Sequence, residues 1–273
     1  MKHNMSKDDL SKFISKDKYN FNDFLKIMEM LREQCPWDRE QTHDSLKRYM
    51  IEEAYEVLEA IDKKSSADLS EELGDLLLQI VFHASIAAES GAFDMSGVIT
   101  GVSKKMISRH PHVFGDVKVN NSDDVLTNWE QIKRDEKGLS GVATAMKKIP
   151  SNLPALMRAY KIQQKAADVG FDWDDIYSVY MKVDEEFYEL REAWDSGDRD
   201  AIAAEMGDMF FALVNLSRFM HVHPELAATA STEKFITRFE LMESIIKSDN
   251  KSMDGMTLSE MDVYWERAKT ELQ

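Results

Sequence analysis

Apolar residues recur at steps of three and four along most of the chain, and the strict alternation of a half-buried strand is scarce. Only five prolines and eleven glycines interrupt this pattern in 273 residues. The sequence therefore predicts an all-α fold. Helices are expected at residues 21–34, 43–63, 67–90, 94–109, 123–137, 153–168, 174–196, 198–220, 230–248 and 257–272.

The helical periodicity fails once near the middle of the chain, so two domains are expected. The stretch KGLSGVATAMKKIPSNLP at residues 137–154 holds two glycines and two prolines, which break helices. The predicted helices therefore form two series, each a bundle of about five helices. The predicted boundaries are an N-terminal domain at 20–137, a linker at 138–152 and a C-terminal domain at 153–273.

Both series carry the same acidic pattern, displaced by 133 residues. MIEEAYEVLEAI at 50–61 is matched by VDEEFYELREA at 183–193, and EELGDLLLQIVF at 71–82 is matched by AEMGDMFFALVN at 204–215. Such a repeat indicates duplicated domains. Each copy has an E-x-x-E step on one helix and an E-x-x-D step on the next, at Glu53, Glu56, Glu72 and Asp75 and again at Glu186, Glu189, Glu205 and Asp208.

These acidic residues predict a metal site, although an acidic run can also be only a solvated helix face. The short connection between the two helices predicts antiparallel packing, which brings the four carboxylates together. Four hard oxygen ligands favour Mg²⁺, with Mn²⁺ as a substitute. A ferritin-like di-iron site would need a Glu-x-x-His step, which neither copy contains. His83 is expected to be a core histidine.

Basic and aromatic residues also recur in both copies, as K-x-x-x-R and W-x-x-x-K steps. Arginine and lysine can hold phosphate oxygens, and an indole can stack on a base. Surface ion pairs and a core indole are the alternative for either step alone. Beside the carboxylates, the combination predicts a site for a metal-bound polyphosphate, and the sequence has no P-loop of a Walker NTPase. The residues are Lys105, Arg109, Trp129 and Lys133 in the first copy and Lys234, Arg238, Trp265 and Lys269 in the second.

Charge and cysteine content narrow the class of protein. With 34 Lys+Arg against 50 Asp+Glu, the net charge of −16 argues against stable binding of nucleic acid. The single cysteine, Cys35, excludes an internal disulfide and suits the cytoplasm. The first twenty residues are polar, and no apolar run reaches the roughly 18 residues of a membrane span. A cytoplasmic protein without membrane contact is expected.

Several stretches spread over about residues 20–273 carry a family resemblance. They are CPWDREQTHDSLKRYMIEEAYEVLEAI, ELGDLLLQIVFHA, RHPHVF, WEQIKRDE, LPALMRAYKIQ, VGFDW, EMGD and NLSRF. Together they resemble the bacterial MazG family of nucleoside triphosphate pyrophosphohydrolases. The resemblance implies an all-α tandem repeat, Mg²⁺ dependence, and hydrolysis of nucleoside triphosphates to nucleoside monophosphates and pyrophosphate. It also implies broad tolerance of the base, homodimerisation and a role in clearing unwanted or excess nucleotides.

The resemblance also implies roles for particular residues. Separately from the resemblance, the chemistry of a metal-bound triphosphate leads us to expect that Glu186 or Glu189 orients the attacking water or takes its proton, and the sequence does not choose between them. The matching residues of the first copy are expected to form a second, weaker site. The family's metal ligands fall on Glu186, Glu189, Glu205 and Asp208, and its substrate contacts fall on Lys234, Arg238, Trp265 and Lys269.

The two copies differ at one position on the carboxylate face, where the second has Asn215 and the first has Phe82. An amide can donate and accept hydrogen bonds to a sugar or phosphate, and phenylalanine cannot. Asn215 can alternatively satisfy a neighbouring backbone group. The C-terminal site is therefore expected to bind substrate through Asn215 and to carry most of the hydrolysis. The N-terminal copy is expected to be weaker, selective or regulatory.

Two other functions are compatible with the pattern: a nucleotide-binding sensor without turnover, and an acidic scaffold that binds a partner protein. Neither would release product from a nucleoside triphosphate. The helix expected over residues 76–88 is apolar almost all round, so it needs more cover than a five-helix domain supplies. This observation also favours a homodimer.

Overall fold

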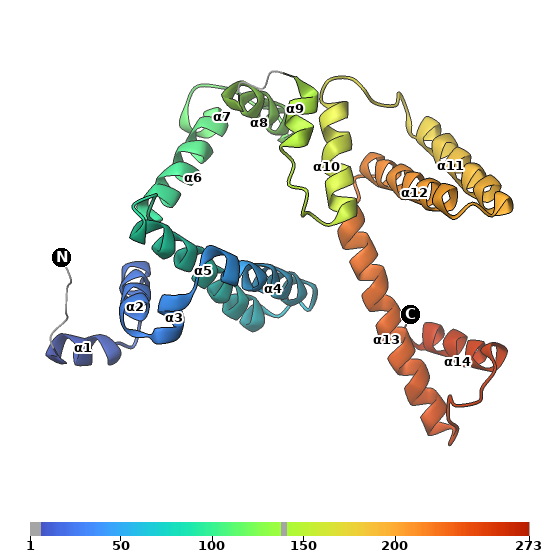
Figure 1. The fold of residues 1–273 in the computed structure, drawn as a ribbon, viewed down its shortest axis with the longest axis horizontal. Helices are drawn as coiled ribbons and strands as arrows, with labels where there is room; N and C mark the ends of the chain where they lie inside the picture. The colour runs from blue at the N-terminus through green and yellow to red at the C-terminus, as the bar shows by residue number, and fades with distance from the viewer. Residues whose placement is uncertain (1–6, 138–140, 273) are drawn as a thin grey trace. The chain divides into compact units, whose positions relative to one another are not determined.

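The computed structural model describes residues 7–137 and 141–272, without the side chains of residues 7–9, 12, 123, 130, 133–135 and 137. All regular structure in this part of the chain is α-helical, which confirms the predicted all-α fold (Figure 1). The chain divides into two compact units, Met1–Glu136 and Lys137–Gln273.

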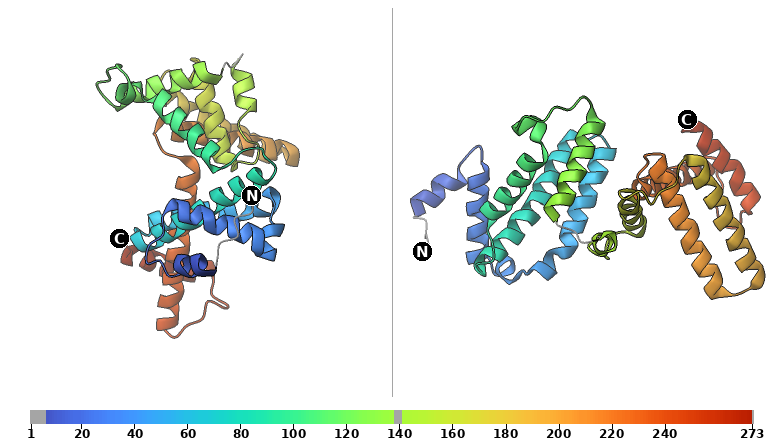
Figure 2. Two further views of the ribbon diagram at one scale, coloured as in Figure 1. Left: turned by 90° about the vertical axis from the view of Figure 1, so that its left-hand side faces the viewer. Right: turned by 90° about the horizontal axis from the view of Figure 1, so that it is seen from above.

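The N-terminal unit is built on one long hairpin. Its helices are α1 (Lys7–Ile14), α2 (Phe21–Gln34), α3 (Pro36–Glu40), α4 (His43–Asp62), α5 (Ser66–Glu89), α6 (Met95–Arg109), α7 (Pro111–Phe114) and α8 (Ser122–Lys137). Helices α4 and α5 run side by side (Figure 2), and α2 packs on α5. Thr42 caps α4 and Ser65 caps α5, because each hydroxyl accepts a hydrogen bond from the first turn. The buried core consists of Met28, Leu46, Val81 and Phe82.

The C-terminal unit contains a matching hairpin. Its helices are α9 (Val142–Lys147), α10 (Ala155–Ala167), α11 (Ile176–Ser196), α12 (Arg199–Phe219), α13 (Pro224–Ser248) and α14 (Leu258–Glu271). Helices α11 and α12 form the hairpin (Figure 2), and α10 packs on α12. Helix α13 contacts α10 and α12 and then pairs with α14. The core between α13 and α14 consists of Met242, Ile245, Ile246, Tyr264 and Ala268.

The helix boundaries follow the sequence pattern closely. The ends of the ten predicted helices lie within two residues of the observed ends, except for the start of α13. That helix begins at Pro224 rather than at residue 230, because proline is favoured at the first helical position, where its missing N–H has no partner to lose. Helices α1, α3, α7 and α9 are not predicted, since four to eight residues are too few to show a helical period.

Part of the predicted linker is helical. Helix α9 lies within residues 138–152 and packs on α10, whereas residues 138–140 lie outside the described part of the chain. The predicted domain boundaries stay a prediction. Among the described helices, none is long and apolar enough to cross a membrane.

Candidate active site

The carboxylates of the C-terminal copy lie on the α11–α12 hairpin. Gly197 has a φ of 72°, which glycine adopts without strain, and Asp198 caps α12, so the two helices reverse direction within two residues. Antiparallel packing then brings one oxygen from each of Glu186, Glu205 and Asp208 within 4.8 Å of the others. These three residues are called the C-terminal triad below.

Lys182 lies one helical turn before Glu186 and holds its carboxylate. The Nζ of Lys182 is 2.7 Å from Glu186 Oε1 and 2.8 Å from Glu185 Oε1. Hydrogen bonds to these two carboxylates raise the pKa of Lys182, so the side chain stays protonated. Glu186 itself is buried. Lys182 belongs to none of the repeated sequence steps, although a spacing of four residues from Glu186 places both side chains on one helix face.

Glu189, the other half of the E-x-x-E step, lies outside the triad. Its pKa is raised, first by partial burial and then by the negative charge of Glu186. The positive charge of Lys182 acts in the opposite direction without cancelling the rise. The site therefore carries excess negative charge, which a divalent cation among the carboxylates would relieve.

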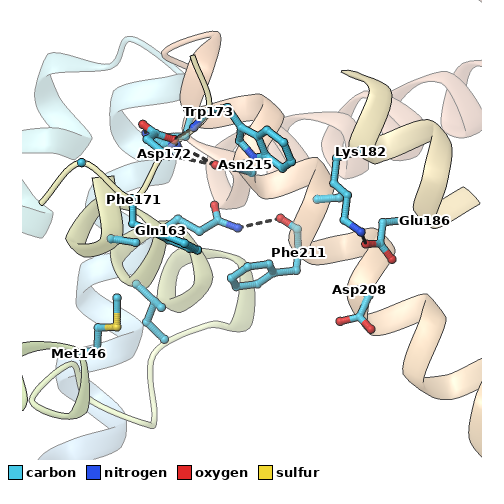
Figure 3. A pocket seen from close by; sticks show the side chains of 15 residues that line it. Met146, Gln163, Phe171, Asp172, Trp173, Lys182, Glu186, Asp208, Phe211 and Asn215 are labelled. Carbon is cyan, nitrogen blue, oxygen red and sulfur yellow. Dashed lines mark hydrogen bonds and ion pairs between the residues drawn. The ribbon is translucent and has the colours of Figure 1, made fainter. Parts of the chain in front are cut away.

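A cavity of about 580 Å³ opens beside the triad, within the C-terminal unit. Lys182, Glu186 and Asp208 lie on one side of it, and Met146 and Phe171 lie on the other (Figure 3). Trp173 and Phe211 add further aromatic surface. One cavity thus combines charged groups with a largely apolar wall, the usual composition of a site for a small polar ligand.

Asn215 lines this cavity in a fixed orientation. Its Oδ1 accepts hydrogen bonds from Arg218 Nε at 3.2 Å and Nη2 at 2.8 Å, and the guanidinium also pairs with Asp172. Because a guanidinium only donates, the Asn215 oxygen must face it and Nδ2 must face away. The partner of Asn215 is therefore a side chain rather than a backbone group, and no residue in the described part of the chain pairs with its Nδ2, which can donate to a ligand.

The predicted substrate contacts on the last two helices lie elsewhere in the unit. Trp265 packs on Phe235, with ring centroids 5.1 Å apart, and Lys269 pairs with Glu266 at 2.7 Å. Their assignment as substrate contacts stays a prediction, because a single chain does not bring them to the cavity. The predicted contacts are Lys234, Arg238, Trp265 and Lys269, and none of them is among the described residues that line the cavity.

The N-terminal unit holds an acidic triad with different members. One oxygen from each of Glu53, Glu56 and Glu72 lies within 4.8 Å of the others, and Asp75 lies outside this set. The pKa of Glu53 is raised by burial, then by a hydrogen bond with Glu56 and by the charge of Asp75. Burial and the charge of Glu56 also raise the pKa of Glu72. Both units therefore gather carboxylates that repel one another.

The surroundings of the two triads differ more than the triads do. Gln79 and Phe82 are buried, and Phe82 is part of the hydrophobic core. Tyr49 packs against the same core. In the N-terminal unit, larger side chains therefore stand at three positions that line the cavity in the C-terminal unit. At the repeat offset, Lys182, Ala212 and Asn215 correspond to Tyr49, Gln79 and Phe82.

His83 is half-buried and faces a second histidine. Its Nδ1 lies 2.7 Å from Nδ1 of His43, and the two rings stack with an interplanar angle of 5°. Burial lowers the pKa of His83, and the neighbouring His43 lowers it further. The C-terminal unit has Ile176 and Leu216 at the corresponding positions.

The basic and aromatic residues of the first copy form a cluster between α6 and α8. Arg109 pairs with Glu136 at 2.8 Å and lies over the ring of Trp129, 5.2 Å from its centroid. Lys105 is exposed one turn earlier on α6. The side chain of Lys133 lies outside the described part of the chain. The role of this cluster in a second site stays a prediction.

Comparison with known proteins identifies the family. The pattern of the MazG nucleotide pyrophosphohydrolase domain matches residues 41–114 and 177–253, one match in each unit. The chain belongs to the MazG family. The nucleoside triphosphate pyrophosphohydrolase/pyrophosphatase MazG of Thermotoga maritima is 47% identical over 251 residues, which cover 91% of this chain and 95% of that protein. The nucleoside triphosphate pyrophosphohydrolase of Escherichia coli is 44% identical over 252 residues, 90% of this chain and 95% of that protein.

A third relative shows the same domains inside a longer chain. The Bacillus subtilis protein YabN is 45% identical over 262 residues, which cover 94% of this chain but 53% of YabN. Both domain matches span the carboxylates of their unit. The family match therefore confirms the predicted tandem repeat and makes the chain a nucleotide pyrophosphohydrolase.

The C-terminal triad fits a divalent metal ion of the kind that MazG domains use. Its donors are hard carboxylate oxygens, which suit Mg²⁺ and Mn²⁺. Ligands about 2.1 Å from one Mg²⁺ are at most about 4.2 Å apart, so small side-chain rotations from the 4.8 Å spread are sufficient. The residues present can hold such an ion.

Several cavity residues were missed as site residues although their stretches carry the family resemblance. Gln163 ends LPALMRAYKIQ, Phe171 and Trp173 belong to VGFDW, and Arg218 belongs to NLSRF. The signal was present in these motifs. Only the packing of α10 on α12 shows that they converge on one cavity.

Proposed function

We propose that the C-terminal unit hydrolyses nucleoside triphosphates to nucleoside monophosphates and pyrophosphate with Mg²⁺, for which Mn²⁺ can substitute. The observation that carries this proposal is the single cavity that joins three charged groups of the site, Lys182, Glu186 and Asp208, to a wall of aromatic and apolar side chains. A triphosphate fits the charged side through a metal ion and Lys182, and a base fits the aromatic side. The names of the Thermotoga and E. coli relatives point to the same substrates.

The residues have separate roles in this proposal. Glu186, Glu205 and Asp208 would hold the metal ion, which would supply Lewis-acid stabilisation of negative charge and lower the pKa of a bound water. Lys182 keeps Glu186 oriented and offers positive charge to the phosphates. Glu189 lies beside the triad but outside it, so we assign it to orient the water and accept its proton. Asn215 orients the nucleotide through its free Nδ2.

A homodimer is part of the proposal. Phe187 of α11 and Phe210 and Leu213 of α12 are 53%, 53% and 41% exposed, an apolar face that a second copy would cover. A dimer would also allow α13 and α14 of one copy to bring Lys234 and Lys269 to the cavity of the other. Sedimentation at micromolar concentration should therefore show a dimer, and a monomer would refute this part.

The physiological role that we propose is the clearance of unwanted or excess nucleotides in the cytoplasm. A largely apolar wall contacts any base chiefly through buried area, so broad tolerance of the base is expected. Because a net charge of −16 disfavours binding to nucleic acid, the proposed substrates are free nucleotides.

The test is product analysis with matched variants. Purified protein is incubated with Mg²⁺ and each nucleoside triphosphate, and the products are separated by chromatography. We expect monophosphate and pyrophosphate, and their loss on chelation of the metal. Nucleoside diphosphate and orthophosphate as primary products would refute the cleavage position. Glu205→Ala should abolish turnover while circular dichroism stays unchanged, whereas Glu72→Ala, its counterpart in the other unit, should retain most of it.

A further inference from the structure

Gln163 is a buried glutamine at the cavity wall with half of its amide unpaired. It lies on α10 and is 7% exposed, and its Nε2 donates a hydrogen bond to the carbonyl oxygen of Phe211 at 2.8 Å. Its Oε1 is buried and has no hydrogen-bond partner among the residues that the structure describes. Figure 3 shows the amide beside Phe211, with Nε2 turned to that carbonyl and the oxygen turned away from it.

The Phe211 carbonyl fixes which end of the amide is which. A carbonyl oxygen can only accept a hydrogen bond, so the amide nitrogen must face it and Oε1 must point elsewhere. The unpaired atom is therefore an acceptor. Buried acceptors without a partner are unfavourable and rare in native proteins, so this one calls for a donor that the chain itself does not provide.

The position of Gln163 indicates which part of a ligand supplies that donor. The charged side of the cavity, at Lys182 and Asp208, is the place for phosphates, which are acceptors of hydrogen bonds rather than donors. Gln163 lies away from these charged groups, beside Phe171 and Phe211 (Figure 3). A nucleotide bound by its phosphates at the charged side therefore directs its base toward Gln163.

We propose that Gln163 recognises the base, with Oε1 accepting a hydrogen bond from an N–H group on its Watson–Crick edge. This inference rests on the proposed function and adds the rule by which the site selects its substrates. Adenine and cytosine carry an amino group on that edge, and guanine, uracil and thymine carry a ring N–H. A single acceptor requires a donor without choosing among the common bases, so it explains broad tolerance and rejects bases that lack an N–H.

Binding involves a local rearrangement at the wall. Oε1 is buried in this structure, so neighbouring groups must move before a base can reach it. Such rotamer changes are common when partners bind. Phe171, with 82% of its surface exposed, is the least enclosed of the large side chains at the wall.

The experiment compares ATP with purine riboside triphosphate, which lacks the amino group and has no N–H on its base. We expect the wild-type protein to prefer ATP by about tenfold in kcat/KM, the effect of one neutral hydrogen bond in a buried site. Gln163→Met keeps the volume and loses the acceptor, so the two substrates should then react equally well. Gln164→Met is the matched control, because Gln164 is exposed, pairs with Asp168 and should leave the preference intact.

One further variant and one binding measurement separate a failure of this inference from a failure of the proposed function. Gln163→Glu, whose buried carboxyl can donate to Phe211 and still accept from the base, should keep the preference for ATP. Equal kcat/KM for the two substrates in the wild-type protein, or a preference that survives Gln163→Met, would overturn the inference and leave the proposed function standing. If no triphosphate is hydrolysed, calorimetry with AMP and purine riboside monophosphate still tests the role of Gln163.

Discussion

The two units of this chain carry the same acidic steps at the same spacing and yet assemble different triads. The N-terminal triad takes both residues of E-x-x-E and one glutamate from α5, whereas the C-terminal triad takes one residue from α11 and both of E-x-x-D. The neighbouring residue one turn earlier differs: Lys182 pairs with Glu186, and Tyr49 at the corresponding place offers Glu53 no cation. Glu53 instead shares a hydrogen bond with Glu56.

The two units share the carboxylates that can bind a metal ion, but they differ in the residues that surround these carboxylates. Both units gather carboxylates that can hold a cation, so the triads alone do not distinguish them. The residues around the triads do, because Lys182, Ala212 and Asn215 leave a charged and open cavity. Their counterparts in the N-terminal unit include Gln79 and Phe82, which are buried. Duplication thus preserved the carboxylates while the cavity diverged.

The largest effect among single changes around the triads is expected at Lys182. Lys182→Met removes a charge beside the phosphates and the partner of Glu186, so kcat/KM should fall by about tenfold to a hundredfold, the range for hydrogen bonds to charged groups. Steady-state kinetics with ATP measure it. Tyr49→Met is the matched change in the other unit and should leave kcat/KM close to the wild-type value. An equal fall in kcat/KM in the two variants would contradict the proposed difference between the units.

The next effect comes from giving the C-terminal cavity the N-terminal residue. Ala212→Gln places a larger side chain in the cavity wall, so KM should rise by about tenfold while pyrophosphate remains the product. Gln79→Ala is the reciprocal change and should not alter KM. An unchanged KM in Ala212→Gln would show that the cavity does not hold the substrate.

A smaller effect is expected at Asn215. Asn215→Asp keeps an oxygen for Arg218 but loses the Nδ2 donor and adds a negative charge to a cavity that takes an anionic substrate, so KM should rise by about fivefold to tenfold. Phe82→Asn makes the N-terminal unit resemble the other one and should leave KM unchanged while lowering the urea midpoint, since it puts an amide into a core. A KM that does not respond to Asn215→Asp would remove Asn215 from the site.

The smallest effect concerns stability rather than turnover. The pKa of His83 is lowered in the folded protein by burial and by His43, so the unfolded chain binds protons more readily. The free energy of unfolding should therefore be at its full value above the ordinary histidine pKa of 6.5 and decrease as the pH falls below it. His83→Leu, which installs the residue of the C-terminal unit, should weaken this dependence. Urea unfolding near neutral pH and about one unit below the histidine pKa measures it.

The sequence predicts the helices well because their starts are marked locally. Thr42, Ser65 and Asp198 accept hydrogen bonds from the first turns of α4, α5 and α12, and apolar periodicity marks the rest. Helices α1, α3, α7 and α9 are not predicted because they are too short to show a helical period. The predicted start of α13 at residue 230 is six residues late, because Pro224 marks the first helical position.

The candidate site could be predicted only in part. The spacing predicts that carboxylates of the two helices meet, since antiparallel helices with a two-residue turn leave little freedom. It could not show which carboxylates converge, because that depends on the Lys182 ion pair and on side-chain rotations. Nor could it show the unpaired oxygen of Gln163, which arises from the packing of α10 on α12.

In the proposed function, the C-terminal unit carries most of the hydrolysis. The direct measurement is pyrophosphate release by two matched double variants, Glu186→Ala with Glu189→Ala and Glu53→Ala with Glu56→Ala, both verified as folded by circular dichroism. We predict that the first pair loses at least about a hundredfold in kcat, as expected for lost metal ligation, and that the second pair keeps most of the wild-type rate. A greater loss in the second pair, or equal partial losses in both, would contradict it.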